Sequence, residues 1–364
     1  MATRLTAERV RSDVDVLSRA GLDLEEFLAE ATDSVGRAVP WVAACLGTHD
    51  PDSHLLTSAR KYGYLSEVNS HDHEFGLVEY GGVEPTAFTE LAASPVPAAG
   101  VHLAHDGDVE RSTRMDTFMR PFFGFGDEAR VVFRDDGRTW GGMALFRGPD
   151  DAPFAAEDVA FLATLSTPFA RGVRVGMLAR VARTAPVAGP TGPAVVIVGA
   201  DDQVLQMTAG AQEWIGRMAV VPASADPYSP VSGLVGAARR YARGETTTPP
   251  RARVRTADGL WLVLHASALT GLGDRAGEVV VTIEEARPPE IVALVVAAFG
   301  LTPRERDVTQ LVLQGVDTKE IGSTLHLSAY TVQDHLRSVF EETGVGPIAV
   351  LASPGSTSTS TCRG

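Results

Sequence analysis

The stretch at residues 301–345 reads LTPRERDVTQLVLQGVDTKEIGSTLHLSAYTVQDHLRSVFEETGV and carries three consecutive helix starts. Each start has a residue whose side chain can cap a helix: Thr302, Asp317 and Ser328. The first start is the strongest, because Pro303 suits the first helical position and Glu305 can bond back to the cap. The stretch therefore predicts three short helices in succession.

The helix expected after Ser328 has one apolar face and one polar face. Val332 and Leu336 fall four residues apart, which places them together on the inner face. The helix before it is short, with Ile321 and Leu325 pointing inward. Two short helices joined by a tight turn, the second of them polar outward, are typical of a helix-turn-helix that reads DNA.

This segment resembles the LuxR-type helix-turn-helix of bacterial transcription factors. The residues that carry the resemblance stand at fixed spacing: 301–305, Gly315, 319–321, Leu325, 327–328, 331–332, 335–336 and 342–345. The resemblance implies a four-helix DNA-binding domain that works as a dimer, with the helix from Ser328 in the major groove.

The same resemblance assigns roles to polar residues. By position, Lys319 and Arg337 touch phosphate, whereas Thr331, Gln333 and Asp334 meet backbone or base edges. Base reading is chemically possible, because glutamine can pair with adenine and aspartate can accept from cytosine. The residues predicted to contact DNA are Lys319, Ser328, Tyr330, Thr331, Gln333, Asp334, Arg337 and Ser338.

Charge and the end of the chain both argue against strong DNA binding by this segment alone. Residues 301–345 hold four basic and seven acidic residues, a net charge of −3. Instead of contacting DNA, Asp334 is also explained as a residue of a solvated helix face, and His335 as a residue packed beside the apolar face. LuxR-type domains continue with a basic fourth helix, but here Pro347 and Pro354 enclose a segment too short for one. We expect DNA binding that is weak or that needs a preformed dimer.

The composition of the 364 residues sets further limits. A net charge of −14 excludes non-specific coating of nucleic acid or of anionic membranes. The longest apolar run, 291–299, is about half of a membrane helix, and residues 1–11 lack a signal-peptide core. With only two cysteines, Cys45 and Cys362, the chain is expected to be a soluble cytoplasmic protein.

Catalytic motifs are absent from the sequence. No P-loop, zinc-protease or serine-hydrolase motif occurs. Asp201 and Asp202 follow an apolar strand, as in the acidic pocket of a receiver domain, but that domain also needs a late lysine. None stands between Lys61 and Lys319, so the aspartate pair is predicted to form a turn. The chain is therefore not expected to be an enzyme.

Proline and glycine divide the rest of the chain. Five of the ten residues at 184–193 are proline or glycine, which predicts a linker, and Arg287 with two prolines marks a second break. The predicted organisation is a helical arm at 1–22, a first sensor-like domain at 23–183, the linker at 184–193, a second sensor-like domain at 194–286, a connecting helix at 287–300, the helix-turn-helix at 301–345 and a disordered tail at 346–364.

The first sensor-like domain has a mixed α+β pattern. Apolar spacing predicts a helix from Leu24, a strand at 41–46 and one long helix at 156–178 that is kinked at Pro168. Two β-rich runs flank Asp135-Asp136-Gly137 and predict a hairpin. The domain is similar to GAF domains through residues 140–145 and 153–158.

The second sensor-like domain is predicted to be another small antiparallel sheet with helices. The expected elements are strands at 194–198, 204–207, 251–256, 260–266 and 278–283, a helix holding Trp214 and a helix at 233–243. The domain is similar to PAS domains. The fold class is thus two α+β modules followed by an all-α domain, and modules of both kinds commonly bind small molecules or mediate dimerisation.

Six of the nine histidines gather between residues 49 and 105. Of these, His71, His73, His102 and His105 are spaced as candidate metal or haem ligands. A polar loop surface explains them more simply, so the sequence requires no metal and no cofactor.

Together these features predict a bacterial one-component transcription regulator. It would sense an unidentified small molecule through its GAF-like and PAS-like domains, and would bind promoter DNA as a homodimer. The alternative is a small-molecule-binding or scaffold protein whose DNA-binding domain is impaired by its altered C-terminus.

Overall fold

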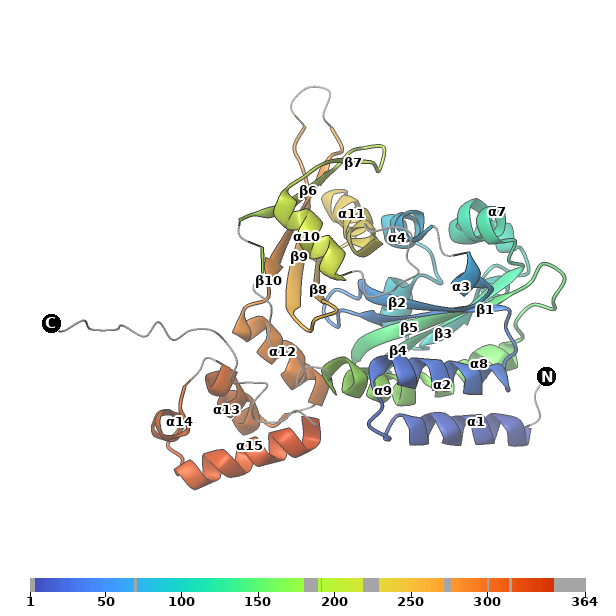
Figure 1. The fold of residues 1–364 in the computed structure, drawn as a ribbon. Coiled ribbons are helices and arrows are strands. Elements are labelled where there is room, and N and C mark those ends of the chain that lie inside the picture. Colours follow the sequence, from blue (N-terminus) through green and yellow to red (C-terminus); the bar gives the residue numbers. More distant parts are fainter. Residues whose placement is uncertain are drawn as a thin grey trace. The chain divides into compact units, whose positions relative to one another are not determined.

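The computed structural model describes residues 4–68, 71–179, 189–190, 192–218, 229–271, 276–299, 301–313 and 316–343 (Figure 1). The predicted tail at 346–364, most of the predicted linker and Gly315 lie outside these ranges. The chain forms two compact units, one of residues 1–176 with 187–285 and one of residues 177–186 with 286–364. Within the described residues, no helix is both long and apolar enough to cross a membrane.

The first sheet of the larger unit has five antiparallel strands in the order β2-β1-β5-β4-β3. They are β1 (Ala43–His49), β2 (Leu56–Gly63), β3 (Ala98–Gly100), β4 (Asp127–Asp135) and β5 (Arg138–Arg147). The predicted hairpin is confirmed as β4 and β5. Asp136 and Gly137 form its turn with φ of 51° and 71°, values that suit a two-residue turn between twisted strands.

Helices cover both faces of this sheet (Figure 1). On one face lie α2 (Leu24–Gly36), α8 (Ala156–Thr164) and α9 (Ser166–Ala179), with α1 (Arg4–Leu17) outside α2. The other face carries α3 (Tyr64–Glu67), α4 (Asp72–Gly81) and α7 (Arg120–Phe123). The remaining short elements are α5 (Phe88–Ala93), α6 (Val101–Ala104), η1 (Val109–Arg111) and η2 (Met115–Met119).

Two predictions for the first module need correction. The strand expected at 41–46 is β1, which begins at Ala43 and extends to His49. The single kinked helix expected at 156–178 is two helices, α8 and α9, which meet at Leu165. Pro168 explains the break, because its ring would clash with the carbonyl of Thr164 four residues earlier in a continuous helix.

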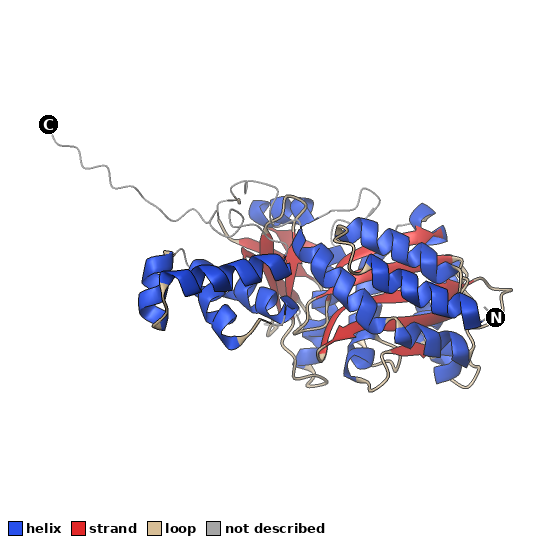
Figure 2. Cartoon of the chain, turned by 90° about the horizontal axis from the view of Figure 1, so that it is seen from below, coloured by secondary structure: helices blue, strands red, loops and turns tan. Residues whose placement is uncertain are grey.

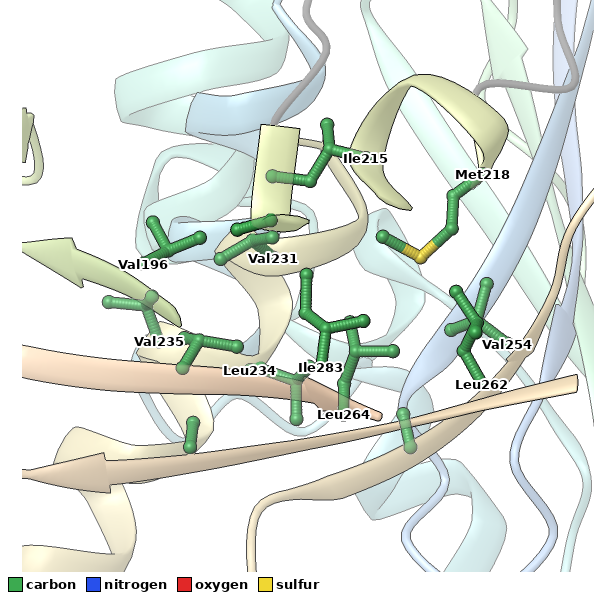
Figure 3. Close-up of a cluster of buried hydrophobic side chains, with 14 of the residues drawn as sticks. Val196, Ile215, Met218, Val231, Leu234, Val235, Val254, Leu262, Leu264 and Ile283 are labelled. Atoms are coloured by element: carbon green, nitrogen blue, oxygen red, sulfur yellow. The ribbon is translucent and has the colours of Figure 1, made fainter. Parts of the chain in front are cut away.

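The second sheet of the larger unit repeats the strand order of the first, as β7-β6-β10-β9-β8. Its strands are β6 (Ala194–Val198), β7 (Val204–Met207), β8 (Arg251–Arg255), β9 (Trp261–Ala268) and β10 (Val279–Glu285). Two helices, α10 (Ala209–Met218) and α11 (Ser229–Ala242), pack against the sheet. Their apolar side chains meet those of the strands in the core shown in Figure 3.

The two sheets share one compact unit because α4 packs along α11. The helices approach closely at Gly76, where an added Cβ would lie 2.3 Å from the hydroxyl of Ser232. At Gly233 an added Cβ would lie 2.9 Å from the ring of Tyr80. Tyr80 and Leu55 of the first module also belong to the core cluster of the second sheet. The second sheet therefore completes its core with residues of the first module.

The smaller unit is helical. It contains α12 (Pro288–Phe299), α13 (Pro303–Leu313), α14 (Thr318–Leu325) and α15 (Ala329–Thr343), as Figure 2 also shows in blue. Its core consists of Val308, Val312, Ile321 and Val332, with Leu336 packed against them. The three predicted helices of residues 301–345 and their apolar faces are thus confirmed.

Candidate nucleic-acid interface and ligand pocket

Local caps build the turn between α14 and α15. The Asp317 carboxylate accepts from the backbone N–H groups of Lys319 and Glu320, and so begins α14. His326 ends that helix in the left-handed region with φ 54°. The Ser328 hydroxyl then accepts from the backbone N–H of Thr331 at 3.0 Å and begins α15. These contacts set the tight turn that orients α15.

The polar face of α15 is open to solvent. Tyr330 is 71% exposed, and Ser328, Gln333 and Arg337 are also exposed, as is Lys319 at the start of α14. Donors on this face can bond phosphate oxygens and base edges. Five of the residues predicted to contact DNA are therefore accessible to solvent, although DNA contact itself stays a prediction.

Three other predicted contact residues have partners within the helical unit. Ser338 donates its hydroxyl to Oε1 of Glu305 at 2.9 Å and thereby ties α15 to the start of α13. Asp334 pairs with Arg337 at 3.5 Å on the surface of α15. Thr331 is half-buried, and its hydroxyl lies 2.8 Å from that of Ser328. Ser338 thus has a structural partner that the helical spacing did not reveal.

Glu305 is the centre of the cap that begins α13. It accepts from the backbone N–H of Thr302 at 2.9 Å and from its hydroxyl at 2.7 Å, and its own N–H donates to that hydroxyl at 3.3 Å. Hydrogen bonds to its carboxylate lower the pKa of Glu305, and the bond from the Thr302 hydroxyl has the largest effect. The predicted capping box is confirmed. The other carboxylate oxygen of Glu305, Oε1, accepts the hydrogen bond from the Ser338 hydroxyl.

The first sheet contains a pocket that the patterns in the sequence did not predict. It encloses about 760 Å³, counting its opening to solvent. The strands contribute Cys45, Gly47, Leu56, Ala59, Lys61, Gly142, Ala144 and Phe146. The helical side contributes His71, Asp72, Phe75, Gly76, Tyr80, Phe118, Met119 and Phe123. Gly233 of α11 also lines it, so both modules contribute to this first-sheet pocket.

Few polar groups face the first-sheet pocket. The Lys61 ammonium forms an ion pair with the Asp72 carboxylate, and both side chains are only 13–14% exposed. Burial raises the pKa of the Cys45 thiol to about 11, so the thiol stays protonated at neutral pH. The hydroxyl of Tyr80 accepts from the backbone N–H of Leu56 at 2.9 Å. Apart from His71, the rest of the lining is apolar, and five of its residues are phenylalanines.

A buried charge network anchors α4, which forms one wall of the pocket. Glu79 of α4 pairs with Arg130 at 2.9 Å and with Arg114 at 3.4 Å. Glu128 bridges the same two guanidinium groups at 2.8 and 2.7 Å. All four side chains are at most 1% exposed. Sequence reasoning missed this network, since nothing local distinguishes a buried arginine from a surface one.

The candidate metal or haem ligands have separate partners. The ring of His71 lies 4.2 Å from that of Phe122, and Nε2 of His73 lies 2.9 Å from the carbonyl of Asp202. The backbone N–H of His102 donates to Asp127, and His105 is buried. Over the ranges that the structure describes, no three His, Cys, Asp or Glu side chains gather as a metal site.

Comparison with known proteins agrees with the geometry of the smaller unit. Residues 300–353 match the family of bacterial regulatory proteins, luxR family. The spore germination protein GerE of Bacillus subtilis (strain 168) is 44% identical over 45 residues, which are 12% of this chain and 61% of GerE. The C-terminal region is therefore a LuxR-type helix-turn-helix domain, and this domain points to transcription regulation.

One solved structure is similar over a longer part of the chain. It is a chain of the E. coli DhaR(N)–DhaL complex, at 12% identity and a TM-score of 0.24, and the likeness covers 79% of this chain and 92% of that one. A TM-score at this level supports no conclusion about fold or function.

Proposed function

We propose that this chain is a one-component transcription regulator without catalytic activity. It binds promoter DNA as a homodimer through α15, and a small molecule in the first-sheet pocket changes that binding. The observation that carries the proposal is the open polar face of α15 within a LuxR-type domain. Lys319 and Arg337 would contact phosphate, while Gln333 would read a base edge.

We assign the first sheet to a GAF-like module and the second to a PAS-like module. Both are five-stranded antiparallel sheets with the same strand order and flanking helices. The first-sheet pocket supports a sensing role, because it is concave, mainly apolar and has few polar groups. Its wall α4 also packs on α11, so a ligand that displaces α4 would act on the second sheet.

The test begins with selection of DNA sequences from a random pool by the full chain, followed by anisotropy titrations at several salt concentrations. Phosphate contacts must give an affinity that falls as salt rises. We expect an enriched sequence with two half-sites and a protein that sediments as a dimer. A chain that enriches no sequence and shows no salt-dependent binding would refute the proposal.

A second function is favoured by the charge of the domain. Residues 301–345 have a net charge of −3, and two of their four basic residues form ion pairs within the segment, Arg304 with Asp307 and Arg337 with Asp334. The chain would then be a small-molecule-binding or scaffold protein whose helix-turn-helix no longer engages DNA. Retention of a ligand together with failure of the DNA selection would support this function.

A further inference from the structure

The floor of the first-sheet pocket is flat because small residues align across three strands. Cys45 of β1 stands opposite Lys61 of β2 on one side and opposite Ala144 of β5 on the other. Two positions along, Gly47 stands opposite Ala59 and Gly142. Since residues two apart in a strand share a face, these two rows form one surface. Only the Lys61 side chain in them is long.

Two larger side chains close one end of that floor. An added Cβ at Gly142 would lie 2.6 Å from the ring of Phe88, and one at Gly47 would lie 2.3 Å from the side chain of Leu56. The glycines thus let Phe88 and Leu56 lie directly against the sheet. The open floor is left over the row of Cys45 and Ala144, where a thin molecule fits best.

The walls around this floor are aromatic. Phe75 of α4 and Phe118 of η2 have ring centroids 6.1 Å apart, and Phe118 and Phe123 have centroids 5.6 Å apart at an interplanar angle of 73°. Phe146 adds a ring from β5. Rings in tilted and edge contact favour another aromatic ring over an aliphatic chain, because edge-to-face and offset contacts add to the burial energy.

The charges that line the pocket cancel. Lys61 and Asp72 form an ion pair on its wall, and no other Lys, Arg, Asp or Glu is among the residues that line it. A charged ligand would lose its hydration without meeting a free counter-charge, which is costly in an apolar cavity. A neutral ligand with one donor and one acceptor can bond the carboxylate of Asp72 and the ammonium of Lys61 while the pair stays intact.

We propose that the first-sheet pocket binds a flat, uncharged aromatic molecule that carries one hydrogen-bond donor beside one acceptor. Such a molecule lies on the floor formed by Cys45 and Ala144, and its polar edge faces the pair of Lys61 and Asp72. This inference rests on the proposed function, because it names the chemical class of the molecule that the regulator would sense.

The experiment compares three bicyclic probes by calorimetry and thermal shift with the full chain: 2-quinolone, naphthalene and 2-naphthoate. We expect 2-quinolone to bind at least about tenfold more tightly than naphthalene, because its lactam supplies the donor and the acceptor. The anion 2-naphthoate should also bind at least about tenfold more weakly, because its charge stays unpaired. Equal binding of the three probes, preference for the anion, or no binding of 2-quinolone would overturn the proposal.

Variants locate the probe. The double substitution Lys61→Met with Asp72→Leu removes both charges together, which proteins often tolerate. It should reduce the preference for 2-quinolone over naphthalene to less than about threefold. If thermal melting shows that this variant is unfolded, Cys45→Leu is used instead, and filling the floor should weaken 2-quinolone at least about tenfold. An unchanged preference in the folded double variant, or an unchanged affinity in Cys45→Leu, would refute the assignment.

The failure of this inference can be told from failure of the proposed function. The probe titrations measure the pocket alone, whereas the DNA titrations measure the regulator. Selective probe binding without any effect on DNA affinity would support the proposed ligand class and refute the sensing role. Salt-dependent DNA binding together with no probe binding would support the proposed regulator and refute the ligand class.

Discussion

The guanidinium group of Arg253 on β8 donates to both carboxylate oxygens of Asp50, which directly follows β1, at 2.7 and 3.0 Å. The two residues are 203 positions apart in sequence, and both side chains are at most 3% exposed. Burial alone would raise the pKa of Asp50, but the bonds from Arg253 outweigh it and hold that pKa below its usual value. This buried pair joins the two sheets.

Removal of one partner from this pair should destabilise the larger unit. In Asp50→Ala the Arg253 charge stays buried without its main partner, so we expect the free energy of unfolding to fall by about 3–5 kcal/mol. Urea denaturation measures this change. Asp52→Ala is the matched control, because Asp52 bonds the same guanidinium but is 61% exposed, and it should cost less than about 1 kcal/mol. Equal effects of the two substitutions would contradict the special role of Asp50.

The close approach of α4 and α11 should make Gly76 intolerant of a side chain. Gly76→Ala places a Cβ 2.3 Å from the Ser232 hydroxyl and 2.8 Å from the backbone nitrogen of Gly233. We expect a loss of about 1–3 kcal/mol, because tightly packed helices must separate. Gly81→Ala at the end of the same helix is the control, since no described atom lies within 4 Å of its added Cβ. Thermal unfolding measures the stability of both variants, and an equal loss in the two would contradict the close packing at Gly76.

His49 should make the larger unit sensitive to acid. It is fully buried, both ring nitrogens lack a described partner, and burial lowers its pKa to about 3. The unfolded chain binds the proton near pH 6.5, so this stabilising contribution is complete above about pH 6.5 and is lost as pH falls toward 3. We expect the free energy of unfolding to fall by about 1.4 kcal/mol per pH unit from this residue over that window.

His49→Phe tests the acid sensitivity, because it keeps a ring but cannot take up a proton. Its stability curve from urea titrations at about pH 6 to about pH 4.5 should be flatter than that of the unmodified chain by about the stated slope. His265→Gln changes an exposed histidine on β9 and should leave the slope unchanged. Parallel curves for the unmodified chain and His49→Phe would show that His49 carries no such contribution.

Ser338 and Lys319 should separate folding from DNA contact. Ser338→Ala loses the bond to Glu305, so stability should fall by about 0.5–1.5 kcal/mol while the salt dependence of DNA binding stays the same. Lys319→Ala should leave stability within about 0.5 kcal/mol and reduce the salt slope by about 1, as expected for one phosphate contact. Urea denaturation and anisotropy on the selected DNA give the two readouts. If Ser338→Ala instead changed the salt slope and Lys319→Ala instead lowered stability, Ser338 would contact the DNA and Lys319 would not.

Local signals made much of the fold predictable. The caps at Thr302, Asp317 and Ser328 were readable because each bonds a backbone group two or three residues away. The turn at Asp136 and Gly137 was readable because aspartate and glycine tolerate the positive φ that a two-residue hairpin turn requires. The place where the long helix breaks was less readable. Pro168 signals a disturbance, but the sequence predicted a kink at this residue, whereas the new helix begins two residues earlier, at Ser166.

The sequence by itself determined the helix-turn-helix, its caps, its apolar core, the strands of the second sheet and three strands of the first (β1, β4 and β5), since these depend on local patterns; β2 and β3 were not predicted. Only the tertiary structure decided that Ser338 bonds Glu305, that Arg253 meets Asp50, and that α4 and α11 join two sheets into one unit. It also decided the pocket over Cys45 and Ala144. The physical reason is that burial of a charge, or space beside a small residue, depends on partners that the chain brings together only by folding.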